Sequence, residues 1–481
     1  MLRKIALVLG VGLAVLAAAV FCVFRPIPAT HHALMGLPDI VALRHFYADA
    51  QSSWRYRLSP DGKYIAWLEA KYLKPALWVR PLEGEETEIF HTDDEVRWYD
   101  WSADGRYLLY QADRDGWEND VIVSIDVSQP GAEPRSYDFG KSVKSWIHSV
   151  PAEAGNEILI THNKRDPGKF DLFRLNLETG QTTPVEQVET LGAGWRVNRR
   201  GEIYAKTVYK TQDDWRTALR APNGGWTQIA QGGMEEWFSV ISEPDESGAL
   251  LALSTLGRDT SALVRFDPAT RAEEVLFEDA TVDTSWVELH PVTGAPLSAV
   301  AYPAYQERTF FDPAYEEMIN AVPREGETAV HRVSSTHDMS KMIFETEHST
   351  RGWSKYLVDQ QTGDVTTLST PRIAAQADHL SPMIPVLFAA RDGMEIHGYV
   401  VLDVNYRGSG GFGRAYREAA VGEVSRKMHH DIVDARAWAV AQGYADPDKV
   451  AVLGGSFGGL KTLTALTESP DLFAACVDIN G

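Results

Sequence analysis

The chain has 481 residues, of which 44% are hydrophobic and 23% are charged, so it is long enough for two or more domains with large cores. Its 46 Lys and Arg residues stand against 67 Asp and Glu residues, and the net charge of −21 argues against nucleic acid and anionic lipid headgroups as partners. Cys22 and Cys476 are its two cysteines, which excludes a disulfide framework and a cysteine-based metal site.

The N-terminus indicates export. Arg3 and Lys4 precede an uncharged run of 20 residues from Ile5 to Phe24, which is long enough as a helix to cross a bilayer. We therefore predict that residues 1–25 are a membrane anchor, with the following domains exported. A cleaved signal at the small residues 17–19, which would leave a secreted or periplasmic protein, is the alternative. Residues 26–49 are predicted to form a linker and lead-in.

Residues 50–380 have the pattern of a repetitive β-structure. A tight turn followed by an alternating strand occurs at Ser59–Trp67 and again at Ser102–Tyr110. Looser copies begin at Asn198, Pro244 and Thr336. Repetition at roughly 40–50 residues, with about four strands in each unit, predicts a β-propeller. We expect seven blades, with eight blades or an irregular pair of β-sandwiches as alternatives.

After residue 380 the pattern changes to that of an α/β domain. Residues 384–400 predict a hairpin, and residues 401–406 predict a buried strand. Residues 415–442 are predicted to be mainly helical, and residues 450–453 are predicted to form the next strand. This order of strand, helix and strand predicts a right-handed parallel unit.

A candidate nucleophile follows that last strand. Gly454, Ser456 and Gly458 form a Gly-x-Ser-x-Gly motif between a β-branched run and a helix-compatible stretch. This context is typical of the nucleophile elbow of an α/β-hydrolase, which exposes a serine hydroxyl on a sharp turn. The backbone N–H of Phe457, at the start of the following helix, is the expected oxyanion donor.

Residues 384–481 resemble the catalytic domain of the prolyl oligopeptidase family, in particular its acylaminoacyl-peptidase and dipeptidyl-peptidase-like branches. The resemblance is carried by residues 390–399, 404–413, 431–438 and 454–459. It implies an N-terminal β-propeller before a C-terminal hydrolase, and a serine-type peptidase that cleaves short peptides through an acyl-enzyme on Ser456. Two departures from the family pattern predict an incomplete α/β-hydrolase domain over residues 381–481. The segment with the second oxyanion donor is missing after Val400, and no histidine follows Ser456.

Other residues offer no substitute for the missing triad acid and histidine. His429, His430 and Asp431 precede the elbow and are expected on a solvated helical face, and Asp478 comes one strand too early for the family's acid. His397 has no spacing that argues for a role. No metal site or cofactor is predicted, and the sequence leaves the oligomeric state open. We therefore expect little turnover by this chain. A non-catalytic exported propeller that binds a peptide or protein partner, and an esterase, are the alternative functions.

Overall fold

The computed structural model describes residues 53–71, 74–83, 90–92, 94–113, 120–129, 131–221, 223–400 and 402–481. The predicted anchor of residues 1–25, the linker of residues 26–49 and Val401 lie outside the described residues. In the described part of the chain, no helix is both long and apolar enough to cross a membrane.

Between Ser53 and Ser369 the described residues form seven antiparallel sheets, each made of consecutive strands. The first three sheets contain β1 (Ser53–Leu58), β2 (Tyr64–Lys71), β3 (Lys74–Pro81) and β4 (Phe90–Thr92); β5 (Val96–Trp101), β6 (Tyr107–Asp113), β7 (Asp120–Asp126) and β8 (Arg135–Tyr137); and β9 (Ser145–Ser149), β10 (Glu157–Asp166), β11 (Lys169–Asn176) and β12 (Thr182–Glu186). The next two contain β13 (Gly192–Val197), β14 (Ile203–Thr211), β15 (Asp214–Arg220) and β16 (Trp226–Gly232); and β17 (Phe238–Val240), β18 (Leu250–Ser254), β19 (Ala262–Phe266) and β20 (Glu273–Phe277). The last two contain β21 (Trp286–Leu289), β22 (Pro296–Ala301) and β23 (Glu307–Phe310); and β24 (Ala329–Ser335), β25 (Lys341–His348), β26 (Gly352–Asp359) and β27 (Val365–Ser369).

The predicted tight turns connect the first and second strands of their sheets. Between β1 and β2, the Ser59 hydroxyl donates to Asp61 Oδ1 at 2.7 Å and accepts from the backbone N–H of Tyr64 at 2.9 Å. The same pattern recurs at residues 102–107 and 336–341, where a hydroxyl bonds an aspartate two residues later and the first backbone N–H of the next strand. These local bonds satisfy the polar groups of the turn and fix where the second strand begins.

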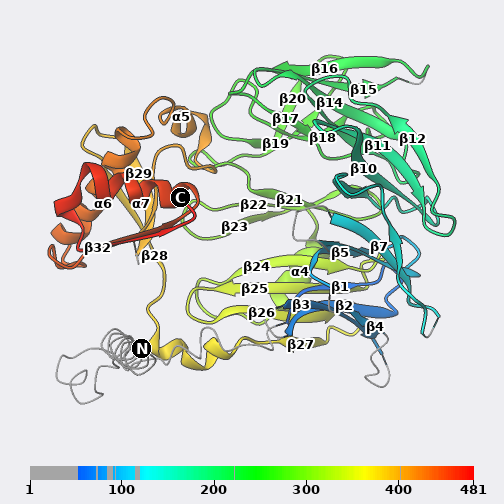
Figure 1. The fold of residues 1–481 in the computed structure, drawn as a ribbon, viewed down its shortest axis with the longest axis horizontal. Helices are drawn as coiled ribbons and strands as arrows, with labels where there is room; N and C mark the ends of the chain where they lie inside the picture. The colour runs from blue at the N-terminus through cyan, green and yellow to red at the C-terminus, as the bar shows by residue number, and fades with distance from the viewer. Residues whose placement is uncertain are drawn as a thin grey trace, which may run out of the picture.

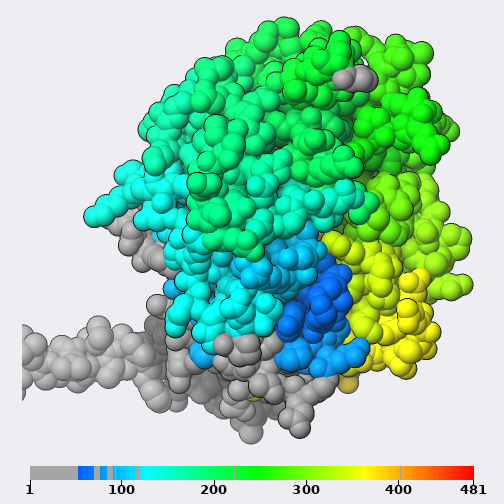
Figure 2. All heavy atoms as spheres, turned by 90° about the vertical axis from the view of Figure 1, so that its right-hand side faces the viewer, coloured from blue at the N-terminus to red at the C-terminus, as the bar shows by residue number. Residues whose placement is uncertain are grey.

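The first and last sheets meet and close a ring. The backbone N–H of Leu58 in β1 donates to Ser334 Oγ in β24 at 2.9 Å. Tyr56 and Leu58 also share an apolar cluster with Ile343 of β25. Figure 1 shows the sheets in succession from blue through green to yellow, and Figure 2 shows the yellow end of this series against the blue beginning. The apolar faces of the two terminal sheets are thereby buried against each other.

One helix within this region was not predicted. In α4 (Pro313–Ala321), the Asp312 side chain accepts from the backbone N–H of Tyr315 at 2.8 Å and caps the N-terminus. Tyr315, Met318 and Ile319 are buried in a cluster that also contains residues of β22, β24 and β25. This helix follows the sixth sheet, which has three strands in the described residues.

The remaining elements begin with a 3₁₀ helix, η1 (Arg372–His379), that leads away from the ring. They continue with β28 (Ile384–Ala389), β29 (Glu395–Val400), β30 (Asp403–Asn405), α5 (Gly413–Glu418), α6 (Lys427–Ala441), β31 (Ala451–Gly455), α7 (Phe457–Glu468), η2 (Pro470–Leu472) and β32 (Ala475–Ile479). The predicted hairpin of residues 384–400 is present, since β28 pairs with β29 in antiparallel register. Figure 1 shows this part as a group of orange and red elements beside the ring of sheets.

One prediction for this part is confirmed and another is wrong. Residues 415–442 are mainly helical, as predicted, and they form two helices, α5 and α6, because Gly422 between them has a φ of +74° that no α-helix adopts. The predicted parallel unit of residues 401–406 and 450–453 does not form. Strand β30 pairs antiparallel with β29, whereas β31 pairs parallel with β32 in a separate sheet. The parallel unit is instead β31, α7 and β32.

Candidate active site

The sequence around Ser456 adopts a strained turn between a strand and a helix. Ser456 comes directly after β31 and directly before α7, with φ +52° and ψ −120°. A positive φ is unfavourable for any residue with a Cβ and persists only where the surroundings enforce it. Two backbone hydrogen bonds hold this conformation: the Ser456 N–H donates to Ile479 O at 2.8 Å, and Leu460 N–H donates to Ser456 O at 3.0 Å.

The glycines on either side of the serine allow this close approach. A Cβ at Gly454 would lie 2.1 Å from the carbonyl oxygen of Gly458, so β31 and α7 touch through their main chains. At Gly459 a Cβ would lie 2.2 Å from Asp478 Oδ1. Neither position can hold a larger residue without a shift of its neighbours.

The serine side chain is accessible. Ser456 is exposed, and its hydroxyl has no hydrogen-bond partner among the described residues. Phe457 is the first residue of α7, so its backbone N–H has no acceptor within the helix and can point to a ligand. The predicted nucleophile and the predicted oxyanion donor are thus adjacent at the N-terminus of a 12-residue helix, whose dipole favours developing negative charge.

No histidine that the structure describes is bonded to Ser456. His429 Nε2 is hydrogen-bonded to Ser469 Oγ at 2.9 Å, and Ser469 is the C-cap of α7. A helix of 12 residues is about 18 Å long, so His429 lies at the end of α7 opposite to Ser456. His397 stacks on Phe412 with ring centroids 4.4 Å apart. Asp478 accepts from the backbone N–H of Gly481 at 2.9 Å.

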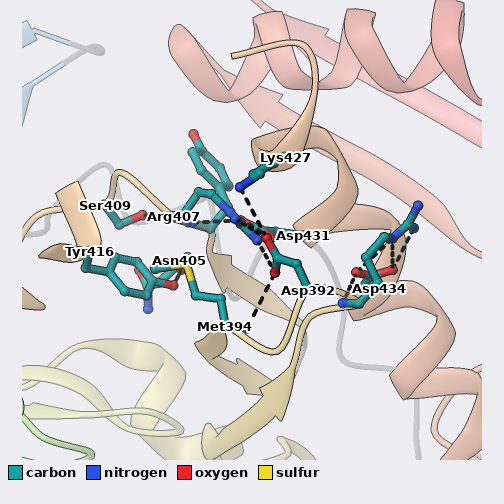
Figure 3. A network of polar contacts seen from close by, with 11 residues as sticks. Asp392, Met394, Asn405, Arg407, Ser409, Tyr416, Lys427, Asp431 and Asp434 are labelled. Carbon is teal, nitrogen blue, oxygen red and sulfur yellow. Dashed lines mark hydrogen bonds and ion pairs between the residues drawn. The ribbon is translucent and has the colours of Figure 1, made fainter. Parts of the chain in front are cut away.

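The expectation of a solvated face for residues 429–431 is wrong. His429 and Asp431 are 4% and 0% exposed, and both point into the protein from α6. Burial lowers the pKa of His429, which favours the neutral form of the imidazole. Asp431 is buried because it is the partner of Arg407 (Figure 3).

Arg407 joins three segments of this part of the chain. Its guanidinium donates to Asp431 Oδ1 and Oδ2 at 2.6 and 2.8 Å, and to Asp392 Oδ2 and Oδ1 at 2.7 and 3.0 Å. Its backbone N–H also donates to Asp431 Oδ2 at 2.9 Å. The hydrogen bonds from Arg407 lower the pKa of Asp392 well below its usual range. Figure 3 shows Arg407 between these carboxylates, which tie the glycine-rich loop of residues 407–413 to α6 and to the β28–β29 turn.

That glycine-rich loop is also fixed to the ring of sheets. Asp259, in the loop between β18 and β19, accepts from the backbone N–H of Ala415 at 2.7 Å through Oδ1 and from that of Arg414 at 2.9 Å through its carbonyl. The backbone N–H of Asp283 donates to Gly411 O at 2.9 Å. Asp259 of the ring of sheets therefore satisfies free N–H groups at the N-terminus of α5, which belongs to the C-terminal part of the chain.

Two residues near the elbow were not singled out from the sequence. Lys461 in α7 is 2% exposed, and its ammonium lies 4.9 Å from the ring centroid of Phe457 and donates to the carbonyl of Val424. Burial lowers its pKa. The ring of Tyr406 lies 6.3 Å from that of Phe457. A lysine in a predicted helix is usually expected at the surface, so the burial of Lys461 became apparent only from the structure. In the described ranges, no group of His, Cys, Asp and Glu side chains could hold a metal ion.

Comparison with known proteins agrees with this arrangement. The profile of the prolyl oligopeptidase family matches residues 392–481, which include the glycine-rich loop with Arg407 and the elbow with Ser456. Dipeptidyl aminopeptidase BIII of Pseudoxanthomonas mexicana is 28% identical over 88% of this chain and 69% of its own length. Residues 392–481 thus match the prolyl oligopeptidase family, and most of the chain is similar to a dipeptidyl aminopeptidase.

Other relatives and solved structures are similar over shorter or longer parts of the chain. Dipeptidyl peptidase family member 6 of Caenorhabditis elegans is 56% identical over 84 residues, which are 18% of this chain and 11% of that protein. A puromycin-hydrolysing peptidase of Mycobacterium tuberculosis has a similar fold, with a TM-score of 0.66 at 16% identity over 91% of this chain and 78% of its own. A prolyl endopeptidase structure gives a TM-score of 0.65 at 16% identity over 93% and 76%. The fold is thus that of this family, a β-propeller with a hydrolase domain.

Proposed function

We propose that Ser456 is the nucleophile position of a serine-type peptidase of the prolyl oligopeptidase family that acts on short peptides. The strained φ of Ser456 between β31 and α7 supports this proposal, because that geometry serves to present a serine hydroxyl. In the reaction, Ser456 Oγ attacks the peptide carbonyl carbon and forms an ester, while the amine leaves with a proton. Water then hydrolyses the ester. The Phe457 N–H would stabilise the oxyanion.

Turnover by this chain is expected to be negligible, because a serine hydroxyl is a weak nucleophile unless a positioned base accepts its proton. No described histidine contacts Ser456, and His429 is held at the other end of α7. Binding and oxyanion donors alone leave a rate several orders of magnitude below that of a complete triad. A non-catalytic peptide-binding module is therefore the second candidate.

A fluorophosphonate probe tests the assignment of Ser456. We expect slow labelling of the 481-residue chain that Ser456→Ala abolishes and that Ser469→Ala, a second serine at the far end of α7, does not. Labelling that survives Ser456→Ala would refute the assignment. Rapid hydrolysis of a dipeptidyl nitroanilide that depends on Ser456 would support the peptidase but contradict the expected lack of turnover. Preferential hydrolysis of simple esters would favour an esterase.

The architecture proposed with this function has a seven-bladed propeller over residues 50–380 and a partial hydrolase domain over residues 381–481. The seven sheets and the contact of β1 with β24 support that blade number.

The proposed anchor of residues 1–25 would hold the exported domains at a membrane. Fractionation followed by N-terminal sequencing tests it: a soluble protein whose N-terminus lies beyond residue 19 would mean a cleaved signal.

A further inference from the structure

A cavity of about 450 Å³ lies where the sixth and seventh sheets meet the β28–β29 hairpin. Its lining differs from that of the elbow, because it combines aromatic and acidic side chains from Tyr302, Tyr305, Glu327, Glu347, Trp353 and Tyr399. Among the described residues that line it, there is no Lys or Arg. Cavities between structural units are common places for small ligands.

Trp353 and Glu347 form the centre of the aromatic and acidic wall. They are direct partners across the antiparallel pair of β25 and β26, so both side chains stand on the same face of the seventh sheet. Trp353 is 43% exposed, and the Glu347 side chain is 45% exposed. An indole face and a carboxylate are thus available side by side to a molecule in the cavity.

The aromatic wall is already ordered by its neighbours. The ring of His331 stacks on Trp353 at 5.6 Å and contacts Trp286 at 5.0 Å, and Trp286 contacts Tyr302 at 5.6 Å. Gln306 donates to the Tyr302 hydroxyl at 2.9 Å. A ligand would therefore meet rings whose orientation is set before binding, which reduces the entropy lost on association.

The charges around this wall leave the Glu347 carboxylate without a matched cation. On the same sheet face, Lys355 lies 3.9 Å from Glu345 and donates to the Trp353 carbonyl at 3.0 Å. In the described part of the chain, the contact found for Glu347 is His331 Nε2 at 3.6 Å, which carries charge only when the imidazole is protonated. The protein as a whole carries a charge of −21, which further raises the local concentration of cations.

The other wall comes from the hydrolase part. The Tyr399 hydroxyl in β29 donates to the carbonyl of Ala304, between β22 and β23, at 2.8 Å. This bond holds the hairpin against the sixth sheet and places a further aromatic ring at the cavity. A ligand bound there would contact both parts of the molecule.

We propose that this cavity is a binding site for an organic cation, that is, an ammonium or guanidinium group carried by a small molecule or a basic side chain. Aromatic faces attract such cations through the ring quadrupole, and a neighbouring carboxylate supplies the opposite charge. The described lining itself contains no Lys or Arg side chain that would repel such a cation, and the neighbouring Lys355 lies 3.9 Å from Glu345. No residue of the elbow around Ser456 is among the described residues that line this cavity.

Calorimetric titration of the full chain with choline and with its uncharged isostere 3,3-dimethylbutan-1-ol tests the proposal. We expect choline to bind with at least tenfold higher affinity than the isostere. Trp353→Ala should weaken choline binding at least tenfold, and Glu347→Gln, which keeps the shape but removes the charge, should weaken it about fivefold. N-acetyl-argininamide titrated in parallel distinguishes the two sources, because tighter binding than choline would indicate a basic side chain.

Trp146→Ala is the matched control, since Trp146 is an exposed tryptophan in β9, 40% accessible and outside the lining of the cavity. It should leave choline binding unchanged. Equal affinity for choline and its isostere would overturn the proposal, as would choline binding that is unchanged in Glu347→Gln. Should Trp353→Ala fail to fold, the Glu347→Gln comparison decides alone.

Discussion

Replacement of Gly454 near Ser456 tests whether this turn requires main-chain contact between β31 and α7, as a nucleophile elbow does, or tolerates a side chain as an ordinary turn would. In Gly454→Ala, the new Cβ would lie 2.1 Å from the Gly458 carbonyl oxygen, whereas real contacts of this kind are not shorter than 3.0 Å, so the atoms must part by about 0.9 Å. The obstacle is the main chain of α7, which cannot rotate away as a side chain would. Overpacking of this kind costs about 1–3 kcal/mol, and a rigid backbone places the cost near about 3 kcal/mol, or over a hundredfold in local stability.

Gly458→Ala is the matched control, because it makes the same chemical change four residues later. A Cβ there meets nothing within 4 Å, and the position is inside α7. Alanine should therefore stabilise the helix, by up to about 1 kcal/mol. Hydrogen exchange measured by mass spectrometry on peptides from residues 450–481 reports both effects as local opening free energies. The reasoning fails if the two substitutions shift exchange in the same direction, or if Gly454→Ala changes it by less than about 0.5 kcal/mol.

Three further outcomes follow from contacts around the site. Asp431→Asn should cost about 3 kcal/mol in urea unfolding of the full chain, because it leaves the buried Arg407 guanidinium without its main counter-charge, and an unchanged midpoint would contradict this. Asp259→Ala should weaken the attachment of the N-terminus of α5 to the ring of sheets, so that a protease cleaves the connecting residues 370–383 faster. An unchanged cleavage rate would show that the Asp259 bond does not hold the two parts of the chain together. Burial depresses the pKa of His429 in the folded state, so unfolding takes up a proton and stability should fall as the pH drops below about 6.5; a His429→Gln variant with an equally steep fall would exclude this residue as a cause.

The sequence allowed the repetitive sheets to be predicted because their turns are coded locally. Serine, aspartate and glycine at fixed spacing make bonds within six residues, and the copy beginning at Ser102 forms the same bonds as the copy at Ser59. The copy at Thr336 shows that glycine is not essential, since Met339 takes the positive φ of +59° there. Helix α4 was missed although Asp312-Pro313 is a start signal for a helix, because a single short helix breaks the pattern of the repeats.

Only part of the candidate site could be predicted, because some of its contacts join neighbouring residues in the sequence and others join distant ones. The elbow at Ser456 depends on a few consecutive residues and on the strand and helix around them, all of which are visible in the sequence. The burial of Asp431 depends on Arg407, which lies 24 residues away and belongs to another element. Periodicity along α6 cannot reveal such a partner. The pairing of β30 with β29 was likewise missed, because a short strand carries no signal of its neighbour.

The way in which the ring closes has a mechanical consequence. Among the residues that the structure describes, the first and last sheets are each made from consecutive strands, and neither contains a strand from the other end of the propeller. Within the described residues, the junction of β1 with β24 rests on side-chain packing and a few hydrogen bonds instead of a continuous ladder. Backbone ladders resist shear much better than apolar contacts between sheets. A force that separates the two ends of the propeller would therefore part this junction before it pulled any strand from its own sheet.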